Sequence, residues 1–191
     1  MRMNFSAVTA TLVIWFVVAS CSGDGREGPE AVQSRSVDTV SLDHHRATEL
    51  DEAAKEVVAF LQGEVGIDRI RLADTVVLYV SPEGGGTRAV FKREQLRHPS
   101  NWRVESGRQS YAFAPPPGMT KLTTRVGRHF NCMEYPLSSR FPELARLPHV
   151  GAKLEPERVD SCLQTWNVTL VFDAAEGPPR LVAAVYDQWE W

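Results

Sequence analysis

The feature that most constrains the fold is a change in hydrophobic period after residue 61. Within residues 44–61, apolar side chains recur three and four positions apart, as on one face of a helix. Asp43 is the expected N-cap of this helix, and Gly63 is the expected stop. After this point apolar residues follow the two-residue period of strands, so we expect one helix followed by a sheet.

The strand patterns cover much of the remaining chain. We predict strands at residues 76–80 and 89–92, and shorter strands around residues 102–105, 109–114 and 121–130. Residues 135–156 contain several prolines and show little strand or helix pattern, except near residues 141–146.

The strongest strand signal lies at the C-terminal end, where residues 163–172 and 180–189 flank a turn and predict a long antiparallel hairpin. On its second strand, strict alternation places Leu181, Ala183 and Val185 on one face. Val182 and Ala184 fall on the other face, so both faces begin apolar and the strand is expected to be central.

These patterns predict an α+β fold. One N-terminal amphipathic helix is expected to pack on a curved antiparallel sheet that ends in a long C-terminal hairpin. In element order, this arrangement is similar to cystatin-like and NTF2-like folds.

The N-terminus has a separate pattern. Arg2 precedes an apolar stretch at residues 7–19, which leads into Val18-Ala19-Ser20-Cys21. The stretch is shorter than the roughly 20 apolar residues that span a bilayer. It resembles a bacterial lipoprotein signal, with an ordinary signal peptide or an uncleaved anchor as alternatives.

The resemblance implies that residues 1–20 are removed and that Cys21 carries the lipid. The protein would then be attached to a membrane of the cell envelope, facing the periplasm or the exterior. Because Ser22 rather than aspartate follows the lipidated cysteine, the resemblance implies the outer membrane if the envelope is Gram-negative.

We therefore divide the chain into three parts. Residues 1–20 form the signal peptide, residues 21–42 form the lipidated cysteine and a flexible tether, and residues 43–191 form a single α+β domain. The tether assignment rests on glycine, proline, serine and mixed charges without apolar periodicity.

The charge balance indicates no nucleic-acid partner. The chain has 21 basic and 24 acidic residues, a formal net charge of −3, and no block of one sign. Six basic residues lie between positions 69 and 97. They form either a local basic strip or the solvated faces of strands and a helix. The six are Arg69, Arg71, Arg88, Lys92, Arg93 and Arg97.

Two cysteines remain in the mature domain, Cys132 and Cys162, and in an exported protein such a pair predicts a disulfide. The alternatives are two free thiols or a zinc site that adds His129 and His149 as ligands. We expect no metal and no cofactor.

Six residues are candidates for ligand binding. Asp187 is a candidate because it lies between apolar neighbours on a predicted strand face. The two histidines are candidates because imidazole groups titrate near neutral pH. The structural alternative is a solvated or arginine-paired aspartate, histidines satisfied by hydrogen bonds and tryptophans in the core or at its rim. The candidates are His129, His149, Trp166, Tyr186, Asp187 and Trp189.

The sequence predicts a membrane-anchored envelope lipoprotein whose domain binds a small molecule or an envelope protein without catalysis. An envelope hydrolase, with zinc as its candidate metal, is the alternative. We identify no catalytic residues, because the spacing of serine, histidine and acidic residues indicates no catalytic triad and no Gly-x-Ser-x-Gly nucleophile elbow occurs.

Overall fold

The computed structural model describes residues 43–80, 86–131 and 135–186. They belong to one compact unit, Val37–Trp191. Within the described residues, no helix has the length and apolar content needed to cross a membrane. The elements in chain order are α1 (His44–Leu61), η1 (Ile67–Arg69), β1 (Leu72–Val80), β2 (Thr87–Lys92), η2 (Arg93–Leu96), η3 (Pro99–Asn101), β3 (Arg103–Ser106), β4 (Gln109–Ala112), β5 (Lys121–Val126), α2 (Leu137–Arg140), β6 (His149–Glu155), η4 (Cys162–Gln164), β7 (Trp166–Asp173) and β8 (Arg180–Tyr186).

Helix α1 has the bounds that its sequence pattern predicts. The Asp43 carboxylate accepts a hydrogen bond from the Arg46 backbone N–H at 2.7 Å, which confirms the expected N-cap. At the other end Gly63 takes a φ of +79°, and its N–H donates to the Phe60 carbonyl at 2.9 Å. A left-handed glycine here terminates the helix without a steric penalty.

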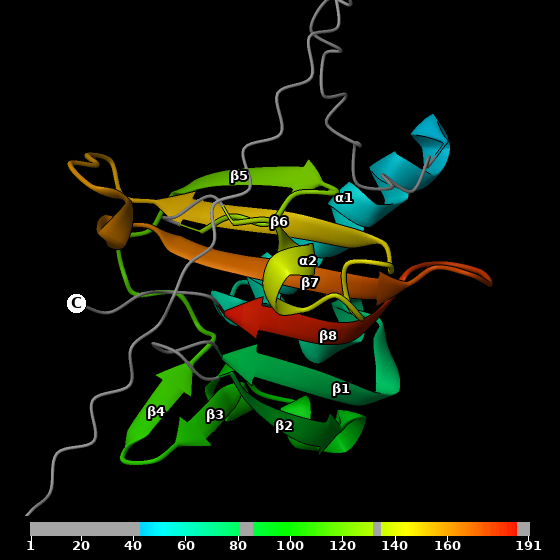
Figure 1. The fold of residues 1–191 in the computed structure, drawn as a ribbon, viewed down its shortest axis with the longest axis horizontal. Helices are drawn as coiled ribbons and strands as arrows, with labels where there is room; N and C mark the ends of the chain where they lie inside the picture. The colour runs from blue at the N-terminus through cyan, green and yellow to red at the C-terminus, as the bar shows by residue number, and fades with distance from the viewer. Residues whose placement is uncertain (1–42, 81–85, 132–134, 187–191) are drawn as a thin grey trace, which may run out of the picture. The chain divides into compact units, whose positions relative to one another are not determined.

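The predicted α+β class is confirmed (Figure 1). Six strands form one sheet in the order β2-β1-β8-β7-β6-β5, and β3 pairs with β4. β7 and β8 form the predicted antiparallel hairpin, and β8 is central. One pair departs from the predicted antiparallel arrangement, because β8 runs parallel to β1.

A β-bulge in β8 changes the predicted side-chain faces. Leu181 pairs with Phe172, but Ala183 pairs with Val171, so Val182 is an additional residue in the ladder. Leu181 therefore packs in the same core as Ala184, whereas Ala183 packs on the opposite face. Strict alternation had placed Leu181 with Ala183.

Strand β6 was not predicted from the sequence. It lies within residues 135–156 and pairs with both β5 and β7. Val150, Gly151 and Ala152 are all buried. Because consecutive residues are covered on both faces and two of them are small, the strand lacks the alternation that marks a half-exposed one.

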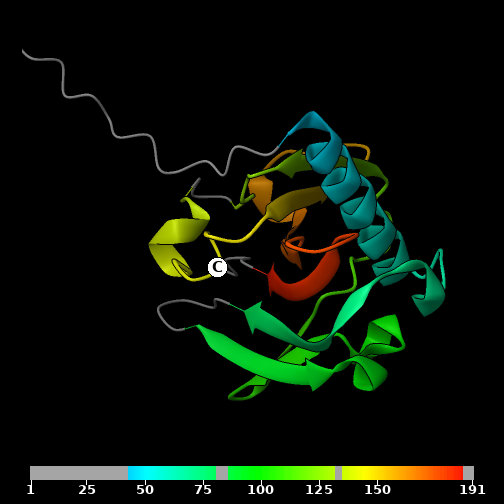
Figure 2. The same cartoon turned by 90° about the vertical axis from the view of Figure 1, so that its right-hand side faces the viewer.

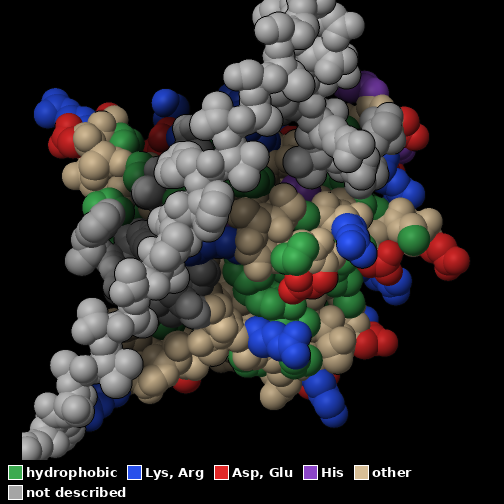
Figure 3. All heavy atoms as spheres, viewed as in Figure 1, with side chains coloured by type: hydrophobic (Ala, Val, Ile, Leu, Met, Phe, Trp, Pro, Cys, Tyr) green, Lys and Arg blue, Asp and Glu red, His purple; other side chains and the backbone are tan. Residues whose placement is uncertain are grey.

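The two faces of the sheet are covered by different segments, with α1 on one side and α2 on the other (Figure 2). The main core lies on the α1 face and includes fully buried Leu50, Val58 and Leu170. A smaller cluster lies on the α2 face, where Tyr79 and Phe141 stack edge to face at 5.3 Å. The surface on the α2 side carries hydrophobic side chains among charges of both signs (Figure 3).

Candidate functional site

The predicted ligand-binding residues do not gather at one place. Trp166 lies in the main core with 1% of its surface exposed, and Tyr186 packs against Phe113 at 5.7 Å in the same core. His149 pairs with Val171 of the cluster on the other face of the sheet. Asp187 and Trp189 lie outside the described residues.

Each of the two histidines forms a hydrogen bond in the fold. The Nδ1 atom of His129 lies 2.7 Å from the hydroxyl of Thr169, which has no exposed surface. Nδ1 of His149 donates to the Leu147 carbonyl at 2.9 Å. These contacts fit the structural interpretation of both histidines.

The predicted disulfide between Cys132 and Cys162 stays a prediction, as do its free-thiol and zinc alternatives. Cys162 begins the short helix η4, and Cys132 lies outside the described residues. Among the described residues, no group of three or more histidine, cysteine and acidic side chains is arranged to hold a metal ion.

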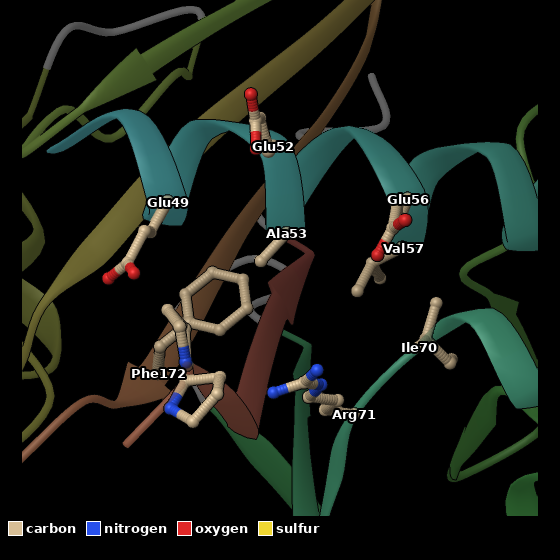
Figure 4. Close-up of a pocket in the computed structure, with 10 residues that line it drawn as sticks. Glu49, Glu52, Ala53, Glu56, Val57, Ile70, Arg71 and Phe172 are labelled. Carbon is tan, nitrogen blue, oxygen red and sulfur yellow. The ribbon is translucent and has the colours of Figure 1, made fainter. Parts of the chain in front are cut away.

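A hollow of about 180 Å³ lies beneath α1 (Figure 4). Ala53 and Val57 line it from the helix, and Phe172 lines it from the end of β7. Arg71 extends toward this space, opposite the helix, while Glu49 and Glu56 belong to the helical wall. The hollow therefore combines apolar walls with charged groups of both signs.

A second hollow of about 470 Å³ adjoins the first, and Ile70, Arg71 and Pro178 line both. Among the described residues that line the second hollow, three are arginines, Arg71, Arg93 and Arg180, and one, Glu176, is a carboxylate. We call this space the arginine hollow. Its basic character comes from residues that are distant in the sequence.

A third hollow of about 750 Å³ continues from the arginine hollow, with Ile67, Ile70 and Arg93 lining both. Lys92 and Arg97 add positive charge to its wall, while Asp74 and Glu94 add negative charge. Ile70 lines all three hollows, so they are neighbours on the surface, and we call the three together the groove.

The strand pairing explains how two of the arginines meet. Parallel strands begin at the same edge of a sheet, and Leu72 of β1 pairs with Leu181 of β8. The Leu181 N–H donates to the Arg71 carbonyl at 2.8 Å. Arg71 and Arg180 each precede one of these paired leucines, so they lie next to each other at the beginning of the two strands.

The loop of the hairpin is held against α1 by one arginine. Nη1 of Arg46 donates to the Gly177 carbonyl at 2.9 Å and to the Glu49 carboxylate at 3.0 Å. The loop contributes Glu176 and Pro178 to the groove. These contacts fix the wall of the groove relative to the helix.

The arginines of the arginine hollow differ in their internal partners. Arg93 donates to Asp74 at 2.6 Å, and Arg180 donates to Asp173 at 2.8 Å. The pKa of Asp173 is lowered by a hydrogen bond from the Ala175 N–H and by the contact with Arg180. The guanidinium of Arg71 forms no hydrogen bond or ion pair with another residue that the structure describes.

The sequence indicated part of this groove. Arg71, Lys92, Arg93 and Arg97 belong to the basic strip considered from the sequence, and all four line the groove. Arg69 is instead paired with Glu56 on α1 at 3.1 Å. Sequence analysis missed Arg180, because its position beside Arg71 depends on the parallel strand pair.

Comparison of the chain with protein-family models, curated proteins and solved structures gave no match. The likeness to cystatin-like and NTF2-like folds remains one of element order. What the groove binds must therefore be inferred from its own side chains.

Proposed function

We propose that the mature chain is a lipid-anchored lipoprotein of the cell envelope whose domain is a non-enzymatic binding module. The N-terminal pattern ending at Cys21 supports the anchor. The observation that carries the binding function is the groove, in which a buried apolar floor is combined with an arginine that has no partner among the described residues. Apolar surfaces with a few oriented polar groups are typical of ligand sites.

The floor of the groove is built from side chains that the fold already holds in place. Ile70 and Leu72 have 7% and 4% of their surfaces exposed, and both belong to the main core. A ligand that lies on them can exclude water from the charged rim without reorganising the backbone. A preformed floor lowers the entropic cost of binding.

No observation favours the hydrolase alternative. His129 contacts a hydroxyl group, which is an arrangement that could activate a nucleophile. However, this hydroxyl belongs to Thr169, which has no exposed surface that a substrate could reach.

The anchor can be tested by intact mass measurement of the chain extracted from membranes of its native host. We expect a chain that begins at Cys21 and carries a diacylglyceryl group, with or without an N-acyl chain. Replacing Cys21 by serine should abolish the lipid mass and release the chain from the membrane. An unmodified Cys21, or an intact residue 1–20 segment, contradicts the anchor.

The binding function can be tested by placing a photo-crosslinking amino acid at Arg97, which is exposed and lines the third hollow. Arg108 is the control position, because it is exposed and lies between β3 and β4 outside the groove lining. We expect one molecule, identified by mass spectrometry, to crosslink at Arg97 and not at Arg108. Equal products at both positions, or none at either, contradict the binding function.

A further inference from the structure

We infer that the groove binds an extended peptide of an envelope protein, with a carboxylate side chain of that peptide seated in the arginine hollow. This inference rests on the proposed binding function and specifies its ligand. It follows from the charges of the hollow, the surroundings of these charges and the extent of the groove.

The charges favour a carboxylate. Three arginines and one glutamate line the arginine hollow. The ion pairs of Arg93 and Arg180 each involve one guanidinium nitrogen, Nη2. A guanidinium carries five N–H donors, and its planar fork matches the two oxygens of a carboxylate. Arg71 has no partner among the described residues, so it is the arginine best able to form such a two-oxygen contact.

The surroundings of the arginines strengthen this contact. Ile67, Ile70, Leu72 and Pro178 form the apolar part of the lining. Ile70 and Leu72 are already buried, whereas a ligand with apolar atoms beside its carboxylate would cover the accessible Ile67 and Pro178 and remove water from the ion pair. Charge pairs attract more strongly in a poorly hydrated site than in bulk water.

The extent of the groove favours an extended chain over a small anion. A single carboxylate or phosphate occupies only part of the arginine hollow, whereas two further hollows adjoin it. An extended peptide can reach the adjoining hollows, because the side chains two residues before and after its anchoring residue share the anchor's face and lie about 7 Å to either side of it.

The first hollow determines which residues can stand near the anchoring acidic residue of the peptide. Glu49, Glu52 and Glu56 line it from α1. Glu49 is paired with Arg46 and Glu56 with Arg69, while Glu52 has no partner among the described residues. The Glu49 and Glu56 carboxylates disfavour a second carboxylate beside them, but their arginine partners remove a strong preference for a cation, and Figure 4 shows Glu52 pointing away from the hollow. The expected ligand therefore has one acidic residue, with an apolar or basic residue rather than a second acidic one toward α1.

The test uses the mature chain, residues 21–191, carrying C21S so that the proposed lipid site is removed and the rest of the mature chain is kept. Two fluorescent peptides are compared by anisotropy, acetyl-Lys-Leu-Glu-Leu-Val and the same peptide with glutamine in place of glutamate. We expect the glutamate peptide to bind about tenfold more tightly, as one charged two-oxygen contact implies.

Variant R71Q should lose this preference and bind both peptides alike. R108Q removes the same charge outside the groove and should retain the preference. Circular dichroism and the urea unfolding midpoint check that R71Q is folded, which is expected because Arg71 is exposed. Equal binding of the two peptides by the unmodified chain, no measurable binding at millimolar concentration, or an unchanged preference in R71Q overturns the inference.

Inorganic phosphate and phosphatidylglycerol vesicles are the other probes. If either binds through Arg71 more tightly than the glutamate peptide, the peptide assignment is overturned. The crosslinking experiment separates this failure from failure of the proposed function. An identified partner at Arg97 with no peptide preference leaves the binding function standing and removes the carboxylate assignment.

Discussion

Replacing Gly151 with alanine tests how closely the chain before Cys132 packs on the sheet. A methyl group at this position would lie 2.6 Å from the Arg128 carbonyl oxygen and 3.0 Å from the Phe130 ring. The carbonyl belongs to the backbone, so the segment itself must move. Such overpacking costs about 1–3 kcal/mol.

Two further contributions enter the expected loss in the free energy of unfolding. Displacement of the segment weakens the hydrogen bond between His129 and Thr169, which is worth about 1 kcal/mol. Replacing a strand glycine by alanine returns roughly 0.5–1 kcal/mol of backbone entropy. The net loss is about 2 kcal/mol, equivalent to a fall of about 4–8 °C in Tm for a domain of this size.

Urea unfolding followed by tryptophan fluorescence measures this loss. Gly86→Ala is the matched control, because its new methyl would have its nearest neighbours at 3.8 and 3.9 Å, ordinary contact distances. The control should change the free energy of unfolding by less than about 0.5 kcal/mol. If Gly151→Ala unfolds at the same urea concentration as the unmodified chain, the tight packing against Arg128 is refuted.

Three other substitutions or treatments have defined expectations. Burial raises the pKa of Asp51, but hydrogen bonds from Lys55 and a β5 threonine lower it by more, so the pKa lies below its usual value of 3.8. Asp51→Asn should therefore lower the free energy of unfolding by about 1 kcal/mol at pH 7. The difference from the unmodified chain should shrink as the pH falls through the lowered pKa, and a difference independent of pH contradicts this. Trp102→Phe should cost about 1–2 kcal/mol in urea unfolding, because the fully buried indole N–H donates to a carbonyl of η2 at 2.9 Å, and an unchanged midpoint would contradict that role. Reduction of the predicted disulfide between Cys132 and Cys162 should cost about 3–4 kcal/mol, and equal stability with and without reductant would contradict the pairing.

The elements that could be predicted from the sequence are those whose signals are local. The bounds of α1 follow from its apolar spacing, its aspartate cap and its terminating glycine, all within or next to the helix. Strand β6 could not be recognised, because its face pattern is hidden by burial on both sides. The bulge at Val182 could not be recognised either, because it depends on the partners of β8 rather than on β8 itself.

The candidate site was less predictable, since its residues meet only through tertiary pairing. The basic residues of the third hollow are close in sequence and were considered as a strip. Trp166 and Tyr186 looked equally suited to a ligand site, but both pack in the core. An aromatic side chain in a strand has the same sequence pattern whether it faces a cavity or a filled interior.

The parallel pairing of β1 with β8 is what makes the arginine hollow. In the predicted antiparallel arrangement, the beginning of β1 would lie beside the end of β8, so Arg71 would be near Tyr186. The observed pairing instead places Arg71 beside Arg180, and two neighbouring cations repel each other unless counter-charges are present.

Asp173 supplies a counter-charge to Arg180 through the adjacent strand pair, but Arg71 forms no ion pair with a described residue. An anion bound at Arg71 would relieve the remaining repulsion, and a ligand that binds only the folded chain stabilises it by mass action. The glutamate peptide should therefore raise the Tm of the unmodified chain more than the glutamine peptide does. R71Q should abolish this difference, whereas a purely structural role for the two arginines predicts no difference in either chain.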